Sequence, residues 1–167
     1  CVPPGDQPKV VKKLIKKKLI LSSTILFLEK PIAKNPKLAI QFIKDLKEYN
    51  LKVGFLFQFL PWYTLLKTLL SGRNKNCEII WSFKANHIAN KNLNSWKSKD
   101  EEGGGVLRFY GIHLIHLLSK MSFENIISSK VTNNIFNQSV SWNALFSDKK
   151  KNSIKISLDV DSNVDDF

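Results

Sequence analysis

The chain has 167 residues, a formal net charge of +12 and 43% hydrophobic side chains, which predicts one globular domain or little more and excludes a disordered or collagen-like protein. Two cysteines, Cys1 and Cys77, are too few for a disulfide framework, so we predict a cytoplasmic protein. The charge comes almost entirely from lysine, with Arg73 and Arg108 as the only arginines, and this disfavours a specific nucleic-acid reader.

Positive charge is concentrated near the start of the chain. Over residues 8–18, lysines are interleaved with valine, leucine and isoleucine, which predicts an amphipathic helix. Its basic face could bind phosphate or an anionic membrane, but such runs are more often solvated helix faces, and we favour that interpretation. The apolar run Leu19–Leu28 is about half as long as a spanning helix, so no membrane segment is predicted.

The first 31 residues predict one βαβ unit of a parallel sheet. Val2 is followed by Pro3, Pro4 and a glycine, which indicates the end of a strand and a loop. The lysine-rich helix comes next, and the short apolar run Ile25–Leu28 is typical of a strand buried on both faces. A strand, a crossover helix and a second strand make the unit complete.

The middle of the chain predicts two helix–strand pairs. Asn35 is expected to cap a helix that begins at Pro36, and Leu51–Phe59 reads as the strand that follows. A second helix, from about Trp62 to Leu70, precedes a strand over Glu78–Lys84. These elements continue the pattern of a mixed α and β protein.

Three glycines at 103–105 follow a polar loop at 85–102 and precede the apolar run Val106–Leu118. We expect this run to be a helix whose N-terminus favours an anionic group, with the glycines allowing close approach of the backbone. Beyond it, Val140–Phe146 and Ile154–Val160 predict two strands joined by a hairpin turn. The order of elements indicates the edge of a parallel domain joined to an α+β domain.

Three segments together resemble one family. Residues 28–31 (Leu-Glu-Lys-Pro) are similar to an E-K-P motif at the end of a dinucleotide-domain strand. Residues 53–61 resemble V-G-Y-x-x-R-F-x-P, and residues 103–113 are similar to G-G-G-x-L-x-D-x-G-x-H. Each motif alone is weak, but in this order and at these separations they resemble the Gfo/Idh/MocA oxidoreductases (glucose–fructose oxidoreductase, inositol dehydrogenase and their relatives).

The resemblance implies an NAD(P)-dependent oxidoreductase that transfers a hydride between nicotinamide and a sugar, sugar-nucleotide or cyclitol alcohol. Residues 1–33 would then be the βαβ remnant of a Rossmann domain. Residues 34–167 would be an incomplete substrate-binding and oligomerisation domain of α+β class, with an open, mostly antiparallel sheet and helices on one face. The chain has no G-x-G-x-x-G and begins with Cys, so we expect part of a longer protein that binds NAD or NADP, inactive as this fragment.

The resemblance also assigns the chemistry. His113 is the expected general acid/base, and Lys30 is the expected cation that hydrogen-bonds the reacting hydroxyl, so these two are the catalytic residues. A cis bond before Pro31 is implied by many relatives. The expected cofactor-binding residues are Pro3, Pro4, Glu29, Lys30 and Pro31. The expected substrate-binding residues are Gln58, Trp96, Phe109 and His113.

The chain departs from the family pattern at polar positions. An aspartate of the motif falls on Phe109, an arginine on Gln58 and a second aspartate on His116. Either the substrate carries fewer hydroxyls, or the protein has lost catalysis and serves as a binding or assembly module. His113 and His116 lie one helical turn apart, but no acidic or cysteine partner is near them in the sequence, so no metal site is predicted.

The expected partners are a sugar-like small molecule and further copies of the chain. We predict a homo-dimer or homo-tetramer formed through the open sheet, because alternating Ile154, Ile156 and Leu158 indicate an apolar sheet face that we expect to be exposed. Neither a specific nucleic acid nor a membrane is expected as a partner.

Overall fold

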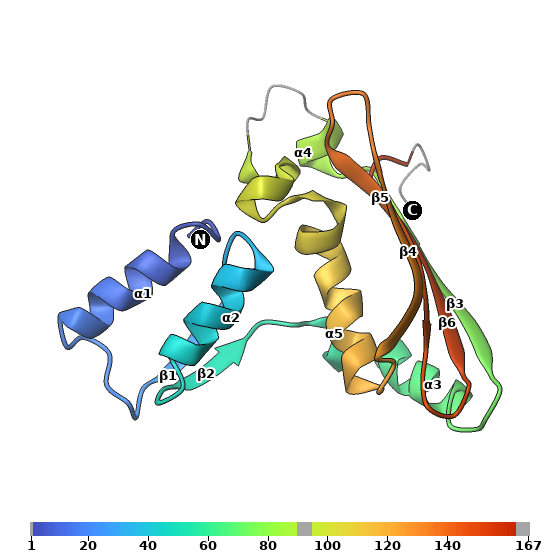
Figure 1. Cartoon of the computed structure of the whole chain (residues 1–167), viewed down its shortest axis with the longest axis horizontal. Coiled ribbons are helices and arrows are strands. Elements are labelled where there is room, and N and C mark those ends of the chain that lie inside the picture. Colours follow the sequence, from blue (N-terminus) through green and yellow to red (C-terminus); the bar gives the residue numbers. More distant parts are fainter. Residues whose placement is uncertain (1, 90–94, 163–167) are drawn as a thin grey trace.

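The computed structural model describes residues 2–89 and 95–162, which form two lobes joined by one short link (Figure 1). We call residues 2–53 the small lobe and the described residues from 57 onward the large lobe. Each lobe has its own cluster of buried hydrophobic side chains, one spanning Val11 to Leu46 and the other Leu66 to Val160. The chain therefore contains two separate cores.

A βαβ unit forms the small lobe, but its members differ from the predicted ones. Strands β1 (Ile25–Leu28) and β2 (Asn50–Val53) pair in parallel, and helix α2 (Pro36–Asp45) connects them. Val2 lies outside any strand, and the chain turns directly into helix α1 (Gln7–Lys16). The predicted strand at Val2 is wrong because the backbone there folds into a turn that starts the helix.

Strand β1 was expected to be buried on both faces, and that expectation is wrong. Leu26 and Leu28 are buried, whereas Ile25 is 62% exposed and Phe27 is 66% exposed. The two helices pack on one face of this two-stranded sheet, so alternate side chains of β1 have no layer to cover them.

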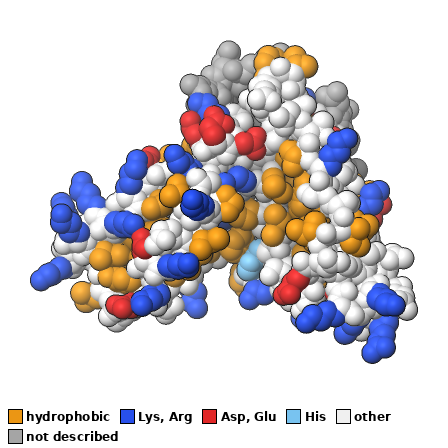
Figure 2. Space-filling view, viewed as in Figure 1, with side chains coloured by type: hydrophobic (Ala, Val, Ile, Leu, Met, Phe, Trp, Pro, Cys, Tyr) orange, Lys and Arg blue, Asp and Glu red, His pale blue; other side chains and the backbone are white. Residues whose placement is uncertain are grey.

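The lysine-rich helix is confirmed as a solvated face. Val11 points into the small core, while lysine side chains project around the lobe that holds α1 and α2 (Figure 2). Lys12 forms an ion pair of 2.6 Å with Asp45 at the end of α2, and this contact holds the pKa of Asp45 below its usual value. One lysine of the basic face thus also joins the two helices.

The predicted cap of α2 is confirmed, since the Asn35 side chain accepts a hydrogen bond of 2.9 Å from the Leu38 amide. The strand expected over Leu51–Phe59 is shorter than predicted. It ends at Val53, and Phe57–Phe59 form a 3₁₀ turn instead. The aromatic side chains in this segment serve the junction between the lobes rather than a sheet.

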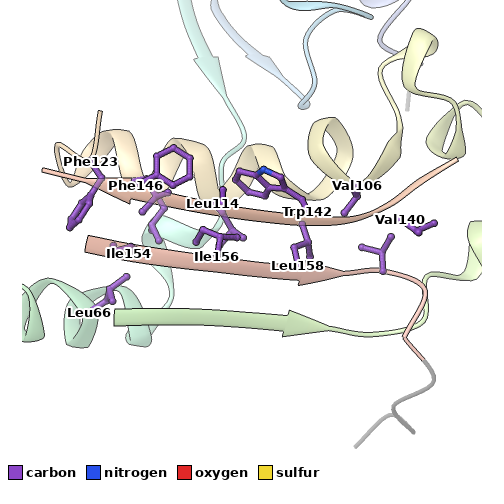
Figure 3. Packing of buried hydrophobic residues seen from close by; sticks show 14 of the residues in the cluster. Leu66, Val106, Leu114, Phe123, Val140, Trp142, Phe146, Ile154, Ile156 and Leu158 are labelled. Atoms are coloured by element: carbon purple, nitrogen blue, oxygen red, sulfur yellow. The ribbon is translucent and has the colours of Figure 1, made fainter. Parts of the chain in front are cut away.

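The large lobe is a mixed four-stranded sheet in the order β3-β6-β5-β4, in which β3 pairs with β6 in parallel and the other pairs are antiparallel. Helix α5 lies along one face, with Leu114 packed among side chains of β5 and β6 (Figure 3). The elements of this lobe are α3 (Pro61–Leu69), β3 (Asn76–Ser82), α4 (Asn86–Ala89), α5 (Ile112–Lys120), β4 (Asn125–Asn133), β5 (Ser139–Ser147) and β6 (Ser153–Asp159).

The predicted hairpin between β5 and β6 is confirmed. Asp148 accepts hydrogen bonds from the amides of Lys150 and Asn152, which closes the turn. The fully buried Asn152 side chain donates to the carbonyls of Leu70 and Gly72, at 3.2 and 3.1 Å. The hairpin is therefore tied to the end of α3 by a satisfied polar network.

The sheet face that was expected to form the oligomer contact is buried inside the large lobe. Ile154, Ile156 and Leu158 are at most 1% exposed because they face α5, not solvent. The opposite face of β5 and β6 carries Asn143 and Lys155, both exposed, among serines. The expectation of an exposed apolar sheet face is wrong, and assembly through the sheet stays a prediction without that support.

One difference concerns the limits of the lobes. Residues up to Val53 pack with the small core, so we propose a domain boundary near residue 54 rather than between residues 33 and 34.

The apolar run Val106–Leu118 begins as a π-helical turn, Val106–Gly111, before the regular α5. Among the described helices, none has both the length and the apolar character needed to span a bilayer.

Candidate active site

The turn after β1 presents Lys30 toward the large lobe. The buried Gln7 side chain donates hydrogen bonds of 3.0 Å to the carbonyls of both Glu29 and Pro31. Pro31 is buried, and the Lys30–Pro31 peptide bond is cis, as the resemblance implied. Gln7 therefore holds the turn on both sides of Lys30. No sequence motif indicates this role.

The Lys30 ammonium reaches the large lobe at the start of α5. Its Nζ donates a hydrogen bond to the Phe109 carbonyl and lies 4.3 Å from the centre of the Phe109 ring. Burial lowers the pKa of Lys30 to about 8, Glu29 opposes this, and the positive charge of Lys97 adds to it. Lys30 can therefore exchange its proton more easily near neutral pH than an exposed lysine can.

His113 lies one turn further along the same helix, inside an aromatic clamp. Its ring stacks on Phe57 at 4.8 Å and meets Phe55 edge-on at 6.3 Å. It is 7% exposed, and its Nδ1 is buried without a hydrogen-bond partner in the described residues. Burial, and then the charges of Lys30 and His116, lower the pKa of His113 to about 4, so the imidazole is neutral at pH 7.

The glycine run approaches the chain's own backbone closely. A Cβ on Gly104 would lie 2.2 Å from the Trp96 carbonyl oxygen, and one on Gly105 would lie 2.1 Å from Oδ1 of Asp100. That carboxylate accepts a hydrogen bond of 2.7 Å from Ser139 Oγ, which in turn accepts from the Val106 amide. We expected this helix start to favour an anionic group; the Asp100 carboxylate lies beside it and connects to the Val106 amide only through Ser139.

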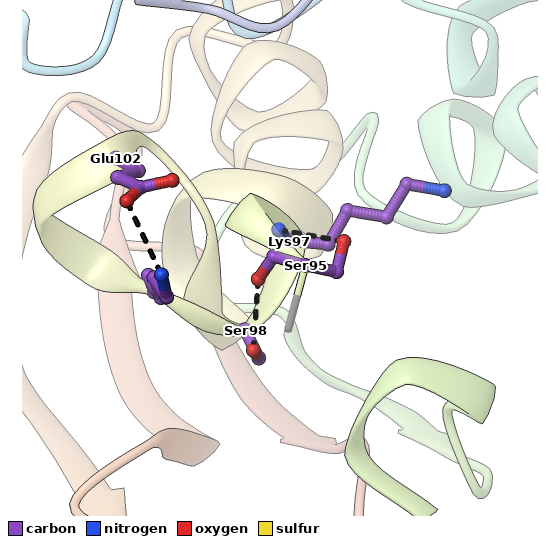
Figure 4. A network of polar contacts seen from close by, with 5 residues as sticks. Ser95, Lys97, Ser98 and Glu102 are labelled. Carbon is purple, nitrogen blue, oxygen red and sulfur yellow. Dashed lines mark hydrogen bonds and ion pairs between the residues drawn. The ribbon is translucent and has the colours of Figure 1, made fainter. Parts of the chain in front are cut away.

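The loop that packs on the glycines is fastened internally (Figure 4). Ser95 accepts from the Lys97 amide at 3.3 Å, and the Ser98 hydroxyl donates to the Ser95 carbonyl at 3.0 Å. Lys99 forms an ion pair of 3.4 Å with Glu102. This loop positions the side chains of Trp96 and Lys97 over the site.

The Phe109 ring is in contact with three further side chains of the site, those of Trp96, Lys97 and His87. Trp96 meets that ring edge-on at 5.4 Å, and the Lys97 Nζ lies 5.4 Å from its centre. His87 also packs edge-on against Phe109 and lies 3.5 Å, through Nδ1, from the Tyr110 hydroxyl. Burial lowers the pKa of His87 to about 4 and raises that of Tyr110 to about 12, so both are neutral at pH 7.

The structure therefore brings Lys30, Trp96, Phe109 and His113 together, with Glu29 and Pro31 on either side of Lys30, whereas Gln58 faces elsewhere. Gln58 turns back to donate to the Phe55 carbonyl at 3.1 Å.

Two residues of the expected cofactor set lie near the N-terminus of the chain. Pro4 is buried, and its Cβ would lie 3.2 Å from a Cβ on Gly103 in the large lobe, so it contacts the other lobe. Pro3 is exposed, and its carbonyl accepts from the Asp6 and Gln7 amides.

His116 stacks on Phe55 at 4.1 Å, and its Nε2 has no hydrogen-bond partner among the residues that the structure describes. In the described parts of the chain, no group of three or more His, Cys, Asp or Glu side chains could hold a metal ion. The pair of histidines is therefore an aromatic contact to the link between the lobes.

An apolar hollow of about 440 Å³ lies next to the clamp, because Phe57 belongs to both. It is lined by Phe57, Leu60, Trp62, Ile79, Ile80, Trp81 and Leu114. The hollow gives the imidazole a neighbouring surface without a charged side chain.

Sequence reasoning missed Gln7, His87, Lys97 and Tyr110. The last three belong to a polar loop or lie beside a motif position, where single residues carry no periodic signal. The one available signal was the cluster of aromatic and basic side chains near the glycine run.

No family model and no curated protein matches the chain by sequence. Solved structures do match it. The WlbA dehydrogenase from Bordetella pertussis, in complex with NADH and UDP-GlcNAcA, is 14% identical with a TM-score of 0.71, covering 100% of this chain and 53% of that one. KijD10, a 3-ketoreductase from Actinomadura kijaniata in complex with TDP-benzene and NADP, is 13% identical with a TM-score of 0.69, covering 96% and 49%.

A third match is the MviM dehydrogenase from Clostridium difficile, which is 20% identical with a TM-score of 0.68 and covers 97% of this chain and 49% of that one. The chain thus spans about half the length of the solved structures that it matches. At these identities the likeness concerns the fold, and it confirms the predicted α+β dehydrogenase fold.

Proposed function

We propose that the chain belongs to the Gfo/Idh/MocA oxidoreductases and is part of an NAD(P)-dependent enzyme acting on the alcohol of a sugar, sugar-nucleotide or cyclitol. Its fold is that of dehydrogenases of this type. The observation that carries the proposal is the meeting of Lys30 from one lobe with the helical turn that bears His113 from the other.

The two residues suit the oxidation of an alcohol. Lys30 has three N–H donors, so it can hold the Phe109 carbonyl and still donate to a substrate hydroxyl oxygen. This donation stabilises the negative charge that develops on the oxygen as its proton leaves. The neutral His113 imidazole accepts that proton and returns it in the reverse direction.

The chain offers a place for the nicotinamide ring of the cofactor but no loop for its pyrophosphate. The carboxyl ends of parallel strands are where open α/β sheets bind ligands, and Lys30 follows the carboxyl end of β1. Glu29 is exposed at the same turn. When bound there, a nicotinamide would supply the hydride acceptor, while the chain holds no G-x-G-x-x-G loop for the pyrophosphate.

The alternative, a non-catalytic relative that serves as a binding or assembly module, is not favoured. Its support was the replacement of motif residues by Phe109 and Gln58 and the absence of a nucleotide loop, together with an expected apolar sheet face that is in fact buried. Phe109 is not a vacant position, because its carbonyl and ring both contact the Lys30 ammonium. The lysine is still positioned without the carboxylate.

The proposal is tested by titrating the complete gene product with NADH and NADPH while following nicotinamide fluorescence. We expect saturable binding of one of them, with a Kd in the micromolar range, about 1 to 100 μM. The same protein is then screened for reduction of NAD and NADP with neutral and anionic sugars. Failure of both nicotinamides to bind would overturn the proposed function.

A further inference from the structure

Two lysine side chains converge on one phenyl ring in the candidate active site. Lys30 Nζ lies 4.3 Å and Lys97 Nζ lies 5.4 Å from the centre of the Phe109 ring, and they come from different lobes. In the described residues, neither lysine forms an ion pair within 4 Å, although ion pairs occur elsewhere in the chain. The contact is therefore between two cations and a shared neutral ring.

The nearby carboxylates do not neutralise this pair. Glu29 attracts Lys30 but makes no ion pair with it, Asp100 accepts hydrogen bonds from Ser139, and Glu102 is paired with Lys99. Lys97 disfavours the charged forms of Lys30 and His87, which shows that its charge acts on the site. Positive potential thus remains at the ring.

We infer that the substrate carries an anionic group, a carboxylate or a phosphate, that binds beside the Phe109 ring within reach of the ammonium groups of Lys30 and Lys97. The inference rests on the proposed function and specifies its substrate class. Ammonium groups form strong, charge-assisted hydrogen bonds with both kinds of anion. Trp96, edge-on to the same ring, offers an apolar surface to the body of the sugar.

The replacement of the motif aspartate also follows from such a substrate. A carboxylate at position 109 would neutralise Lys30 and repel an incoming anion across a short distance. The Phe109 ring instead keeps Lys30 in place through its face and its backbone carbonyl, and it adds no negative charge. With phenylalanine in place of the motif aspartate, the site has no carboxylate of its own beside Lys30 and is open to the anionic group of a substrate.

The test measures the affinity of the complete gene product, without cofactor, for glucuronate, glucose 1-phosphate and glucose by calorimetry. We expect at least one anionic sugar to bind about tenfold more tightly than glucose. The comparison of glucuronate with glucose 1-phosphate distinguishes a carboxylate from a phosphate. Lys97→Gln should remove most of the advantage of the anionic sugar over glucose, whereas Lys97→Arg should keep at least part of it.

Lys67 provides the matched control, because its Nζ lies 5.5 Å from the centre of the Tyr63 ring on α3, outside the site. Lys67→Gln should leave all three affinities unchanged. Equal binding of neutral and anionic sugars, or an advantage that survives Lys97→Gln, would overturn the inference. Anion binding that depends on Lys97 in a protein that binds neither NADH nor NADPH would support it and contradict the proposed function.

Discussion

The two lobes differ in how completely they bury their own side chains. In the large lobe, residues such as Trp142, Leu114 and Ile156 are at most 1% exposed, since a helix covers one sheet face. In the small lobe, Phe42 is similarly buried, but Phe27 on the open face of the sheet is 66% exposed. The large lobe has the packing of an independent core, whereas the small lobe is a single layer on one side of two strands.

This difference explains where the chemistry is located. Lys30 belongs to the small lobe, which buries its side chains less completely, and it is held in place by contacts to the large lobe. Its Nζ bonds the Phe109 carbonyl, and in return the Arg108 guanidinium donates to the Ala33 carbonyl at 2.9 Å. The reciprocal bonds join the lobes at the residues that form the site.

The largest effect is expected from the centre of the large core. Trp142→Ala should lower the free energy of unfolding by about 3 to 5 kcal/mol, because it leaves a cavity and removes the bond from the indole to Ser129. Chemical denaturation followed by circular dichroism measures this. A loss below about 1 kcal/mol would mean that the sheet and α5 are not one cooperative core.

The small lobe should respond locally to an equivalent change. Phe42→Ala is expected to cost about 3 kcal/mol, but chiefly in the lobe that it packs. Hydrogen exchange should show faster exchange in β1 and β2, while β5 and β6 stay protected. Loss of protection in both lobes together would contradict the comparison, since it would make the two cores a single unit.

Acid should act on the large lobe selectively, because all three histidines belong to it. Burial lowers the pKa of His87 and His113 to about 4, whereas in the unfolded chain they titrate near 6.5. The unfolded state binds more protons in between, so stability falls as the pH is lowered from 6.5 to 4. The full shifts of the two groups would give an upper limit of about 7 kcal/mol, which solvent screening at these half-buried sites reduces to a few kcal/mol.

Denaturation of the large lobe at several pH values measures this loss. The double variant His87→Gln, His113→Asn should show a flatter profile over the same range. An unchanged slope in that variant would assign the acid sensitivity to other groups.

The smallest effect is expected at the contact between the lobes. Arg108→Met removes a charge-assisted hydrogen bond and should cost about 1 kcal/mol, seen as faster exchange of the amides around residues 31–34. Arg73→Met is the matched control, because that exposed arginine lies in the turn after α3. Equal effects of the two changes would show that the Arg108 bond does not hold the lobes together.

The sequence predicted most of what periodic patterns encode. The cap at Asn35, the hairpin at Asp148 and the lysine face of α1 are local features, and each is confirmed. Strand β4 was missed because all nine of its residues are exposed at the sheet edge, which leaves no alternation to detect. The burial of Ile156 was misjudged because alternation gives the period of a strand but not which face is covered.

The candidate site was only partly predictable for the same reason. Motif positions gave Lys30 and His113, and the structure places both at the junction of the lobes. The contributions of Gln7, Lys97 and Phe57 depend on contacts between segments far apart in the sequence, which no spacing rule reports. Phe109 was expected only as a lost aspartate, whereas its ring and carbonyl organise the site.

The most direct test of the central claim is the single-turnover rate of hydride transfer in the complete gene product. We predict that Lys30→Met and His113→Asn each slow this step by about a hundredfold or more, with nicotinamide binding retained. The two residues act on the same hydroxyl group, Lys30 on its oxygen and His113 on its proton, so the double variant should be slower than either single variant by much less than the product of their effects. Hydride transfer at an undiminished rate in the double variant would contradict the account.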